Sequence, residues 1–264
     1  MQHLDADEGD VLQLDRRQSD REIEFLGVAF APMDNETLFD RVVHKGSERG
    51  SFEYLVTPNV DQIVRLHANS DLAPLIEGAW VRVNDSRILQ TLASLSGIQL
   101  PACPGSDLSA RLLAQAIDAH EPVVIIGCSG EVVDAVRARY GLTNVRWYEP
   151  PMGLRNNPDA IAQTALFCAN NPARFHFLCV GNPQQEMIAQ AIKARGDGVG
   201  VGLCVGASLE FLAGKRARAP KWMQQLRMEW LFRLLSEPKV LWRRYLVEGP
   251  KIFKIWQGWR KTMR

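Results

Sequence analysis

Short apolar runs alternate with longer amphipathic segments along most of the chain. The apolar runs predict strands over residues 51–56, 80–83, 122–126, 175–180 and 199–203. The segments between them predict helices over residues 58–68, 87–95, 107–119, 131–140, 158–170 and 184–194. Strands that alternate with helices of this length are joined by crossover connections. We therefore expect an α/β fold with a Rossmann-like, largely parallel sheet and helices on both of its faces.

The two ends of the chain fall outside this pattern. Residues 1–21 are polar and lack periodicity, so we expect a disordered lead-in. From Pro220 onward the strand signal disappears, and the sequence predicts helices that break at Glu237-Pro238 and at Gly249-Pro250. The expected organisation is thus a lead-in (1–21), an α/β body (22–214) and a helical, membrane-associating appendage (215–264).

Charge distinguishes the appendage from the body. The 264 residues carry 31 Lys and Arg against 30 Asp and Glu, a net charge of +1. Residues 215–264 hold 14 of the basic and 3 of the acidic side chains, a net of +11, which leaves −10 for the rest. Five of the seven tryptophans also lie in this segment. A basic, tryptophan-rich segment favours contact with an anionic surface.

The appendage has two chemically distinct faces when it is drawn as a helix at about 100° per residue. The apolar side gathers Trp242, Tyr245, Leu246, Ile252, Phe253, Ile255, Trp256 and Trp259. The other side carries Arg243, Arg244, Lys251, Lys254 and Lys261, and Arg260 breaks the pattern. Such a helix suits an anionic membrane surface. The alternative is that its apolar side packs on the body; nucleic acid is disfavoured because the body is acidic.

The remaining composition points to a cytoplasmic protein that is at most peripheral on a membrane. The five cysteines form no C-x-x-C pair, so we expect reduced, buried thiols. The N-terminal residues are acidic and contain no apolar export signal. No apolar stretch is long enough to span a bilayer. Homo-oligomerisation is left open.

Candidate site residues follow the predicted strands, because ligands of open α/β sheets bind beyond the carboxyl ends of the strands. Thr57-Pro58-Asn59 follows strand 51–56; Thr57 can be a helix N-cap, and the helix start can also receive a phosphate or a sugar hydroxyl. Asp85 follows strand 80–83 and is either a general base or a cap of the next helix.

A third turn, residues 181–186, carries Asn182, Gln185 and Glu186 at a predicted helix start. These side chains suit hydrogen bonds to a polyhydroxylated ligand, or they cap the turn and do nothing more. A fourth turn, residues 127–130, does not complete the dinucleotide motif G-x-G-x-x-G.

Several catalytic signatures do not occur. The histidines are scattered, without H-E-x-x-H, and no G-x-S-x-G elbow is found. The only Asp-x-Asp is Asp5-Ala6-Asp7, in the lead-in. We therefore expect no metal site and no cofactor.

A set of motifs, taken in order, resembles the WecG/TagA/CpsF family of glycosyltransferases from about Glu22 to the C-terminus. The motifs are Thr57-Pro58-Asn59, Asp85, Gly105-Ser106-Asp107-Leu108, the turn 181–186, Leu212-Ala213-Gly214, Arg218-Ala219-Pro220, Glu229-Trp230-Leu231-Phe232-Arg233, Glu237-Pro238 and Arg243-Arg244-Tyr245. Each motif alone is weak, whereas the ordered set is highly specific. The resemblance implies an inverting, metal-independent enzyme that moves a sugar from a UDP-sugar donor to a polyprenyl-diphosphate-linked saccharide at the inner membrane face.

The resemblance also assigns roles to residues. Asp85 matches the proposed base, which would take the proton from the acceptor hydroxyl. Thr57 and Asn59 match residues that position sugar or acceptor, and Gln185 matches a donor-binding glutamine. Without a metal, the leaving diphosphate needs cations. The candidates are Arg233, Arg243 and Arg244.

Three departures from the family pattern concern charge and backbone. Ser86 stands where glycine usually follows the base, and 101–104 lack the usual arginine. The substitutes that we expect for this arginine are Arg82 and Arg87, which flank the base. Pro238-Lys239-Val240 replaces a common Pro-Arg-Arg. The loop departures favour a hexose or hexuronic acid donor of an exopolysaccharide pathway over the teichoic-acid donor.

Two other functions remain as alternatives. A dinucleotide-dependent oxidoreductase could be built on a similar sheet, but the chain lacks the complete glycine fingerprint. A non-catalytic adaptor could dock to membranes through the same appendage. Three observations would separate these functions. UDP release that depends on the acceptor supports the glycosyltransferase, NAD binding the oxidoreductase, and lipid binding without turnover the adaptor.

Overall fold

The computed structural model describes residues 22–48, 50–216, 219–220, 222–223 and 228–263. The expected lead-in, with its Asp-x-Asp, and Arg218 lie outside the described residues. The first half of the body contains β1 (Ile23–Phe25), β2 (Val28–Phe30), α2 (Asn35–Ser47), β3 (Glu53–Val56), α3 (Val60–Ala68), η1 (Ser70–Leu72), α4 (Ala73–Glu77), β4 (Val81–Arg82), α5 (Arg87–Ser94) and α6 (Gly105–Gln115). The second half contains β5 (Val123–Gly127), α7 (Gly130–Tyr140), β6 (Val145–Tyr148), η2 (Leu154–Asn156), α8 (Pro158–Asn170), β7 (Phe175–Cys179), α9 (Gln184–Arg195), β8 (Val201–Cys204) and α10 (Ser208–Leu212). The C-terminal elements are α12 (Glu229–Ser236), α13 (Pro238–Trp242), the π-helical turn η3 (Arg243–Glu248) and α14 (Lys251–Thr262).

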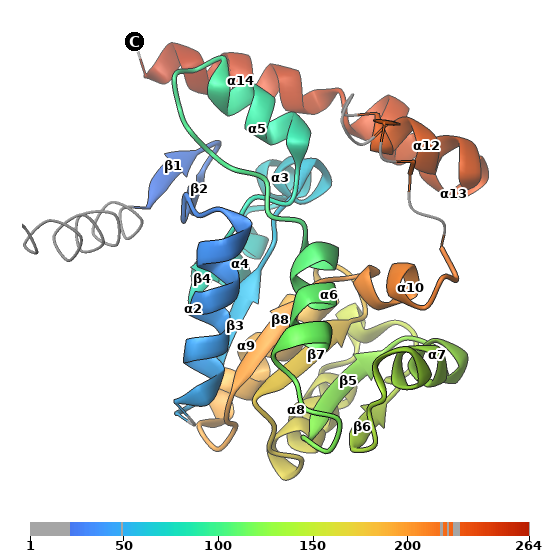
Figure 1. Cartoon of the computed structure of the whole chain (residues 1–264). Coiled ribbons are helices and arrows are strands. Elements are labelled where there is room, and N and C mark those ends of the chain that lie inside the picture. The colour runs from blue at the N-terminus through green and yellow to red at the C-terminus, as the bar shows by residue number, and fades with distance from the viewer. Residues whose placement is uncertain (1–21, 49, 217–218, 221, 224–227, 264) are drawn as a thin grey trace, which may run out of the picture.

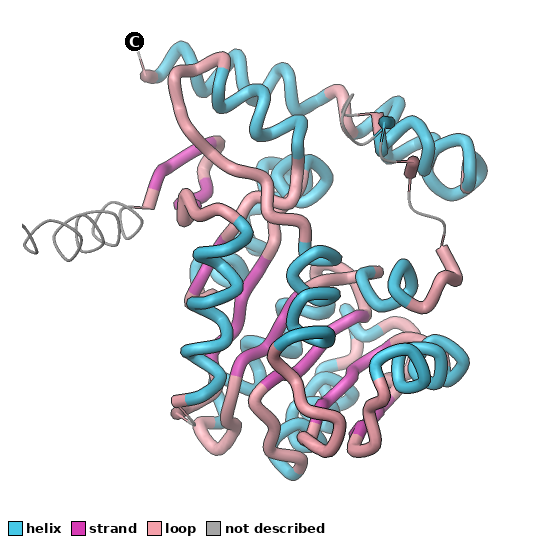
Figure 2. The backbone as a smooth tube through the Cα atoms, in the orientation of Figure 1, coloured by secondary structure: helices cyan, strands magenta, loops and turns pink. Residues whose placement is uncertain are grey.

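The main sheet has six strands in the order β4-β3-β8-β7-β5-β6, and every neighbouring pair is parallel. This confirms the expected fold class (Figures 1 and 2). Two strand elements escape the sequence prediction, the β1–β2 hairpin and the edge strand β6. β6 is partly exposed along its length, so it lacks the continuous apolar run of a buried strand. The hairpin strands are only three residues each, although residues 25–31 are apolar.

Alternating side chains of the central strands fill two cores. Tyr54 and Val56 pack in one cluster with residues of α3, α5, α8 and α9, whereas Leu55 packs in the other with residues of α2, α6, α7 and α10. The strands are buried on both faces, as parallel sheets require. Helices therefore cover both faces, and the carboxyl ends of the strands emerge along one edge.

The C-terminal helix α14 packs on the body. Ile252 is buried in the core cluster of α3 and β1, and Ile255, Trp256 and Trp259 pack against it. The Trp256 Nε1 donates a hydrogen bond to Ser96 Oγ at 2.8 Å, and the Trp259 ring meets the Phe25 ring edge-on at 5.1 Å. The predicted breaks at Glu237-Pro238 and Gly249-Pro250 coincide with element boundaries and are confirmed.

The apolar stripe expected along the appendage is therefore divided between the body and solvent. Residues from Ile252 to Trp259 that face the body form core, as in the packing alternative. The apolar side chains that stay exposed here are Trp222, Leu235, Trp242, Leu246, Val247, Phe253 and Met263. Membrane contact was expected for Trp256 and Trp259, with packing on the body as the alternative, and the structure shows the packing. Trp259 contacts Phe25 of the β1–β2 hairpin, which is absent from the sequence prediction, and Trp256 donates to Ser96.

The cysteines are free among the described residues. Cys103, Cys168, Cys179 and Cys204 are buried, and Cys128 is partly buried. This agrees with the expectation of reduced, mostly buried thiols.

Candidate active site

A cleft of about 910 Å³ lies at the carboxyl edge of the sheet. It is lined by the turns that follow β3, β4, β7 and β8, which the parallel register brings to the same level. The C-terminal elements α12, η3 and the start of α14 form its other wall. Segments from both ends of the sequence thus meet around one cavity.

Asp85 lies in this cleft and is held by backbone contacts. Its carboxylate oxygen Oδ1 accepts a hydrogen bond from the Gly105 N–H at 3.0 Å, and its own N–H donates to the Pro58 carbonyl at 3.1 Å. The adjacent Ser86 is the residue that caps α5, through its Oγ and the Leu89 N–H. Asp85 is therefore not the cap of that helix, and its carboxyl group is available to the cleft.

Glycine at position 105 permits this arrangement. A Cβ there would lie 3.1 Å from a Val205 methyl group and 3.4 Å from Thr57 Oγ1. The start of α6 can therefore approach the ends of β3 and β8 closely enough for its first N–H to reach Asp85. The motif residue Gly105 thus supports the candidate base directly.

The environment of Asp85 suits a general base that works near neutral pH. Burial in the cleft raises the pKa of its carboxyl group from 3.8 to about 7. The Gly105 hydrogen bond opposes this rise, the carboxylates of Glu229 and Asp107 add to it, and the Arg233 guanidinium opposes it. A base is most effective when its pKa lies near the operating pH.

Thr57 and Asn59 both line the cleft, but their local roles differ from the sequence prediction. Asn59, not Thr57, is the N-cap of α3: its side chain accepts hydrogen bonds from the N–H groups of Asp61 and Gln62. Thr57 is buried, and its Oγ1 donates to the Cys204 carbonyl at 3.4 Å. The prediction that Thr57 caps this helix is wrong, since the chain stays extended through Asn59 before the helix begins.

The turn after β7 contributes Asn182 and Gln185 to the cleft lining. Gln185 Oε1 accepts a hydrogen bond from the Gly206 N–H at 2.9 Å, which joins the turns after β7 and β8. Glu186, grouped with them as a substrate-binding residue by the sequence, is fully buried and is not part of the cleft lining. It lies beneath the site, where a ligand in the cleft does not reach it.

Among the residues that the structure describes, five arginines line the cleft: Arg65, Arg87, Arg216, Arg233 and Arg244. Arg65 and Arg244 both approach Asp61 Oδ2, at 3.1 and 3.5 Å. Arg233, on α12, lies over the Phe211 ring, and Arg216 pairs with Glu210. Such an array of guanidinium groups suits a ligand with two phosphates.

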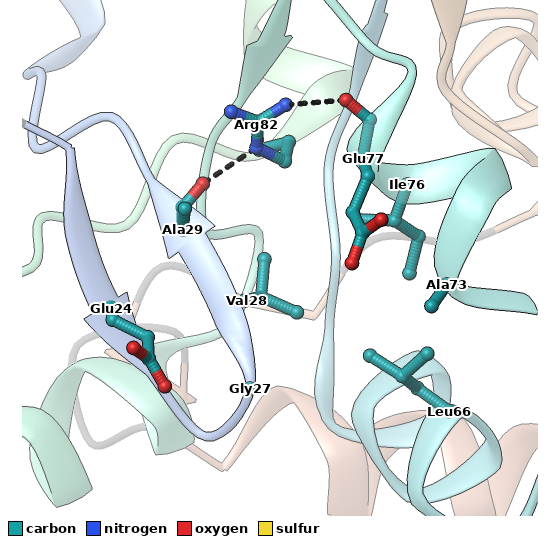
Figure 3. A pocket seen from close by; sticks show the side chains of 9 residues that line it. All are labelled: Glu24, Gly27, Val28, Ala29, Leu66, Ala73, Ile76, Glu77 and Arg82. Carbon is teal, nitrogen blue, oxygen red and sulfur yellow. Dashed lines mark hydrogen bonds between the residues drawn. The ribbon is translucent and has the colours of Figure 1, made fainter. Parts of the chain in front are cut away.

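Two arginines predicted for the site lie elsewhere. The Arg82 guanidinium is buried behind the sheet edge, where it donates to the carbonyls of Ala29 and Glu77 (Figure 3). It also donates to the Ala79 carbonyl and pairs with Glu22. It lines a separate cavity of about 270 Å³, because residues that alternate along β4 point to opposite faces. Arg243 is directed to solvent, with its side chain 75% exposed, and does not line the cleft.

Two findings concern metals and membranes. Within the described ranges, no group of three or more His, Cys, Asp or Glu side chains is placed to hold a metal ion. In the same part of the chain, no helix combines the length and apolarity needed to cross a bilayer.

A sequence model described as "Glycosyl transferase WecG/TagA/CpsF family" matches residues 23–264, nearly the whole chain. The chain belongs to this family. Membership in the WecG/TagA/CpsF family implies glycosyl transfer in polysaccharide synthesis, with a sugar donor and an acceptor as substrates.

Several of the motifs that carry the WecG/TagA/CpsF resemblance contribute residues to the cleft. Gly105 and Ser106 form one part of its wall, Glu229, Trp230 and Arg233 a second part, and Arg244 and Tyr245 a third. These segments are far apart in the sequence and line one cavity with Asp85 in the fold.

Sequence reasoning missed two arginines of this family member's cleft, Arg65 and Arg216. For Arg65 a signal existed: it lies six residues after the cap Asn59 on a helix that starts at the cleft. For Arg216 none existed, because its position follows from the path of the chain after α10.

Proposed function

We propose that this glycosyltransferase moves a sugar from a UDP-sugar to a polyprenyl-diphosphate-linked saccharide, with inversion at the anomeric carbon and without a metal ion. The observation that carries the proposal is Asp85: a partly buried carboxyl group, with a pKa of about 7, in an arginine-lined cleft. The site combines one candidate base with cations suited to diphosphate.

In the proposed reaction an acceptor hydroxyl oxygen attacks the anomeric carbon of the donor. The bond between that carbon and the UDP oxygen breaks on the opposite side, and UDP leaves with the electron pair. Asp85 takes the hydroxyl proton as the new bond forms. Attack and departure on opposite sides invert the configuration.

The arginines supply the positive charge that the departing diphosphate needs. Arg233 is close enough to Asp85 to influence its pKa, so a phosphate beside Arg233 would lie near the reacting atoms. Arg65 and Arg244, which both approach Asp61, supply two further cations in the cleft. Arg87, at the start of α5, replaces the arginine that the family has before Gly105. Because these arginines supply positive charge, the proposed transfer needs no metal ion.

The surface around the cleft supports an acceptor that is anchored in a membrane. Leu246 and Phe253 line the cleft and are both about half exposed. Trp242 and Val247 extend this apolar surface outward, and Lys254 is exposed beside it. Apolar side chains with adjacent cations suit an anionic bilayer, here the inner face of the plasma membrane.

Acceptor-dependent UDP release tests the proposal. The protein is incubated with UDP-glucose, UDP-glucuronic acid or UDP-N-acetylmannosamine, each with and without a polyprenyl-diphosphate-linked acceptor, and product configuration is read by NMR. We expect release only with acceptor and an inverted linkage. Retention of configuration would overturn the mechanism. NAD reduction by a substrate alcohol would favour an oxidoreductase, and vesicle binding without any turnover would favour an adaptor.

A further inference from the structure

Glu186 is fully buried in the first turn of α9, directly beneath the cleft. One of its carboxyl oxygens, Oε1, accepts two side-chain amides: Gln185 Nε2 at 2.9 Å and Gln62 Nε2 at 3.1 Å. These two glutamines come from helices that follow different strands, β7 and β3. A single buried oxygen therefore joins two of the turns that line the cleft.

The first arm of this junction fixes the glutamine that lines the cleft. The Gln185 amide places its oxygen on the Gly206 N–H and its nitrogen on Glu186. An amide has one accepting and one donating end, so these two contacts together admit one orientation. Loss of the Glu186 acceptor would leave the amide free to rotate away from Gly206.

The second arm leads to the candidate base. Gln62 Oε1 accepts a hydrogen bond from the Asn59 N–H at 3.0 Å, which completes a reciprocal cap at the start of α3. The carbonyl of the preceding residue, Pro58, accepts the N–H of Asp85. The line of hydrogen bonds therefore runs from the β8 turn, through Glu186, to the turn that carries Asp85.

We propose that Glu186 is a positioning residue that holds Gln185, in the turn after β7, in register with the turns after β3 and β4 that carry Asn59 and Asp85. The inference rests on the proposed function, in which donor and acceptor groups meet at these turns. Burial raises the pKa of Glu186, although donors on Gln185, Asn182 and Gln62 oppose the rise. The required property is thus a correctly placed acceptor oxygen, which a neutral group also provides.

Two substitutions separate this role from others. Glu186→Gln keeps a carbonyl acceptor and should retain kcat and the donor KM within about threefold. Glu186→Leu fills similar space without an acceptor and should lower kcat/KM for the donor on the order of 10²-fold, the cost of a misplaced reacting group. Glu36→Leu, at an exposed position in the first turn of α2, is the matched control and should leave activity unchanged.

Hydrogen exchange at the Gly206 and Asn59 amides gives a readout that does not depend on turnover. Both amides should exchange faster in Glu186→Leu than in the wild type or in Glu186→Gln. If Glu186→Leu does not fold, two single variants replace it in the test. Gln185→Leu should speed exchange at the Gly206 amide alone, and Gln62→Leu should speed exchange at the Asn59 amide alone. Because Glu186 holds both arms, Glu186→Leu should add little to the loss caused by a Gln185→Leu, Gln62→Leu double variant.

The outcomes distinguish this inference from the proposed function. Wild-type kcat/KM and unchanged exchange in folded Glu186→Leu would overturn the positioning role. Equal loss in Glu186→Gln and Glu186→Leu would also overturn it, because the charge would then be the required property. A wild-type protein that turns over no donor and acceptor pair contradicts the proposed function alone, and the exchange measurements still decide the role of Glu186.

Discussion

Replacing Asp85 with asparagine should stabilise the protein at alkaline pH while it abolishes most activity. The substitution keeps an oxygen for the Gly105 N–H and removes a charge from a partly buried site. A carboxyl group whose pKa is higher in the folded than in the unfolded chain binds its proton more tightly when folded. Its stabilising contribution is complete below pH 3.8 and is lost as the pH rises to about 7.

The size of the effect follows from the shift. A rise from 3.8 to about 7 is roughly 3 pKa units, and at about 1.36 kcal/mol per unit the charged form costs at most ~4 kcal/mol. Water in the open cleft screens part of this cost, so we expect Asp85→Asn to gain about 1–3 kcal/mol at pH 8.5. The gain should shrink steadily between pH 7 and pH 4. Loss of the base should lower kcat by about 10²–10⁴-fold.

Urea unfolding followed by tryptophan fluorescence, at pH 8.5 and at pH 4.5, measures the gain. The control is Asp118→Asn, which neutralises an exposed carboxylate in the connection between α6 and β5 and should change neither stability nor rate. An Asp85→Asn protein no more stable than wild type at pH 8.5, or equally stabilised at both pH values, would refute the reasoning about burial. Near-normal turnover would remove Asp85 from the mechanism.

Three further predictions concern the cations and the C-terminal helices. Arg65→Gln should lower kcat/KM at least about tenfold, because it removes a charged contact to phosphate. Arg195→Gln, which replaces an exposed arginine paired with Asp197, should leave kcat/KM unchanged. Equal kcat/KM in the two variants would exclude Arg65 from the site. Turnover should persist in EDTA, and a loss that added Mg²⁺ or Mn²⁺ restores would contradict the assignment of cationic roles to arginine. Trp256→Ala should destabilise the fold by about 3 kcal/mol in thermal unfolding, because Trp256 packs against the core. Trp242→Ala, at an exposed position, should leave stability within about 0.5 kcal/mol and weaken sedimentation with anionic vesicles. The reverse pattern would mean that the buried and exposed faces are wrongly assigned.

The sequence predicted the fold class because the central strands are continuous apolar runs, which only a sheet buried on both faces explains. It located Asp85, Asn59 and Gln185 because each follows such a strand, and parallel strands bring these positions together. The sequence did not predict the direction in which a side chain points. Arg82 and Glu186 are close in sequence to Asp85 and Gln185, yet each points away from the cleft.

The two faces of α14 could not be assigned from periodicity alone. A helical wheel separates apolar from basic positions, but the same apolar stripe serves a core or a membrane. In the fold, Phe25 of the β1–β2 hairpin packs against Trp259, so Trp259 belongs to the face that packs on the body. Tertiary partners of this kind lie more than 200 residues away in the sequence, where local pattern carries no information.

The packing of α14 on α3 has a geometric consequence for substrate choice. α3 (Val60–Ala68), whose N-cap Asn59 lies in the cleft, has nine residues, which span about 13 Å, so this one short helix joins α14 to the turn whose Pro58 carbonyl accepts the Asp85 N–H. If the enzyme sits on a bilayer through α14, as we propose, its base would lie at a constant height above the headgroups. That height would then select acceptors by how far their free hydroxyl stands from the lipid, and activity would peak at one acceptor length and fall for saccharides one sugar shorter or longer.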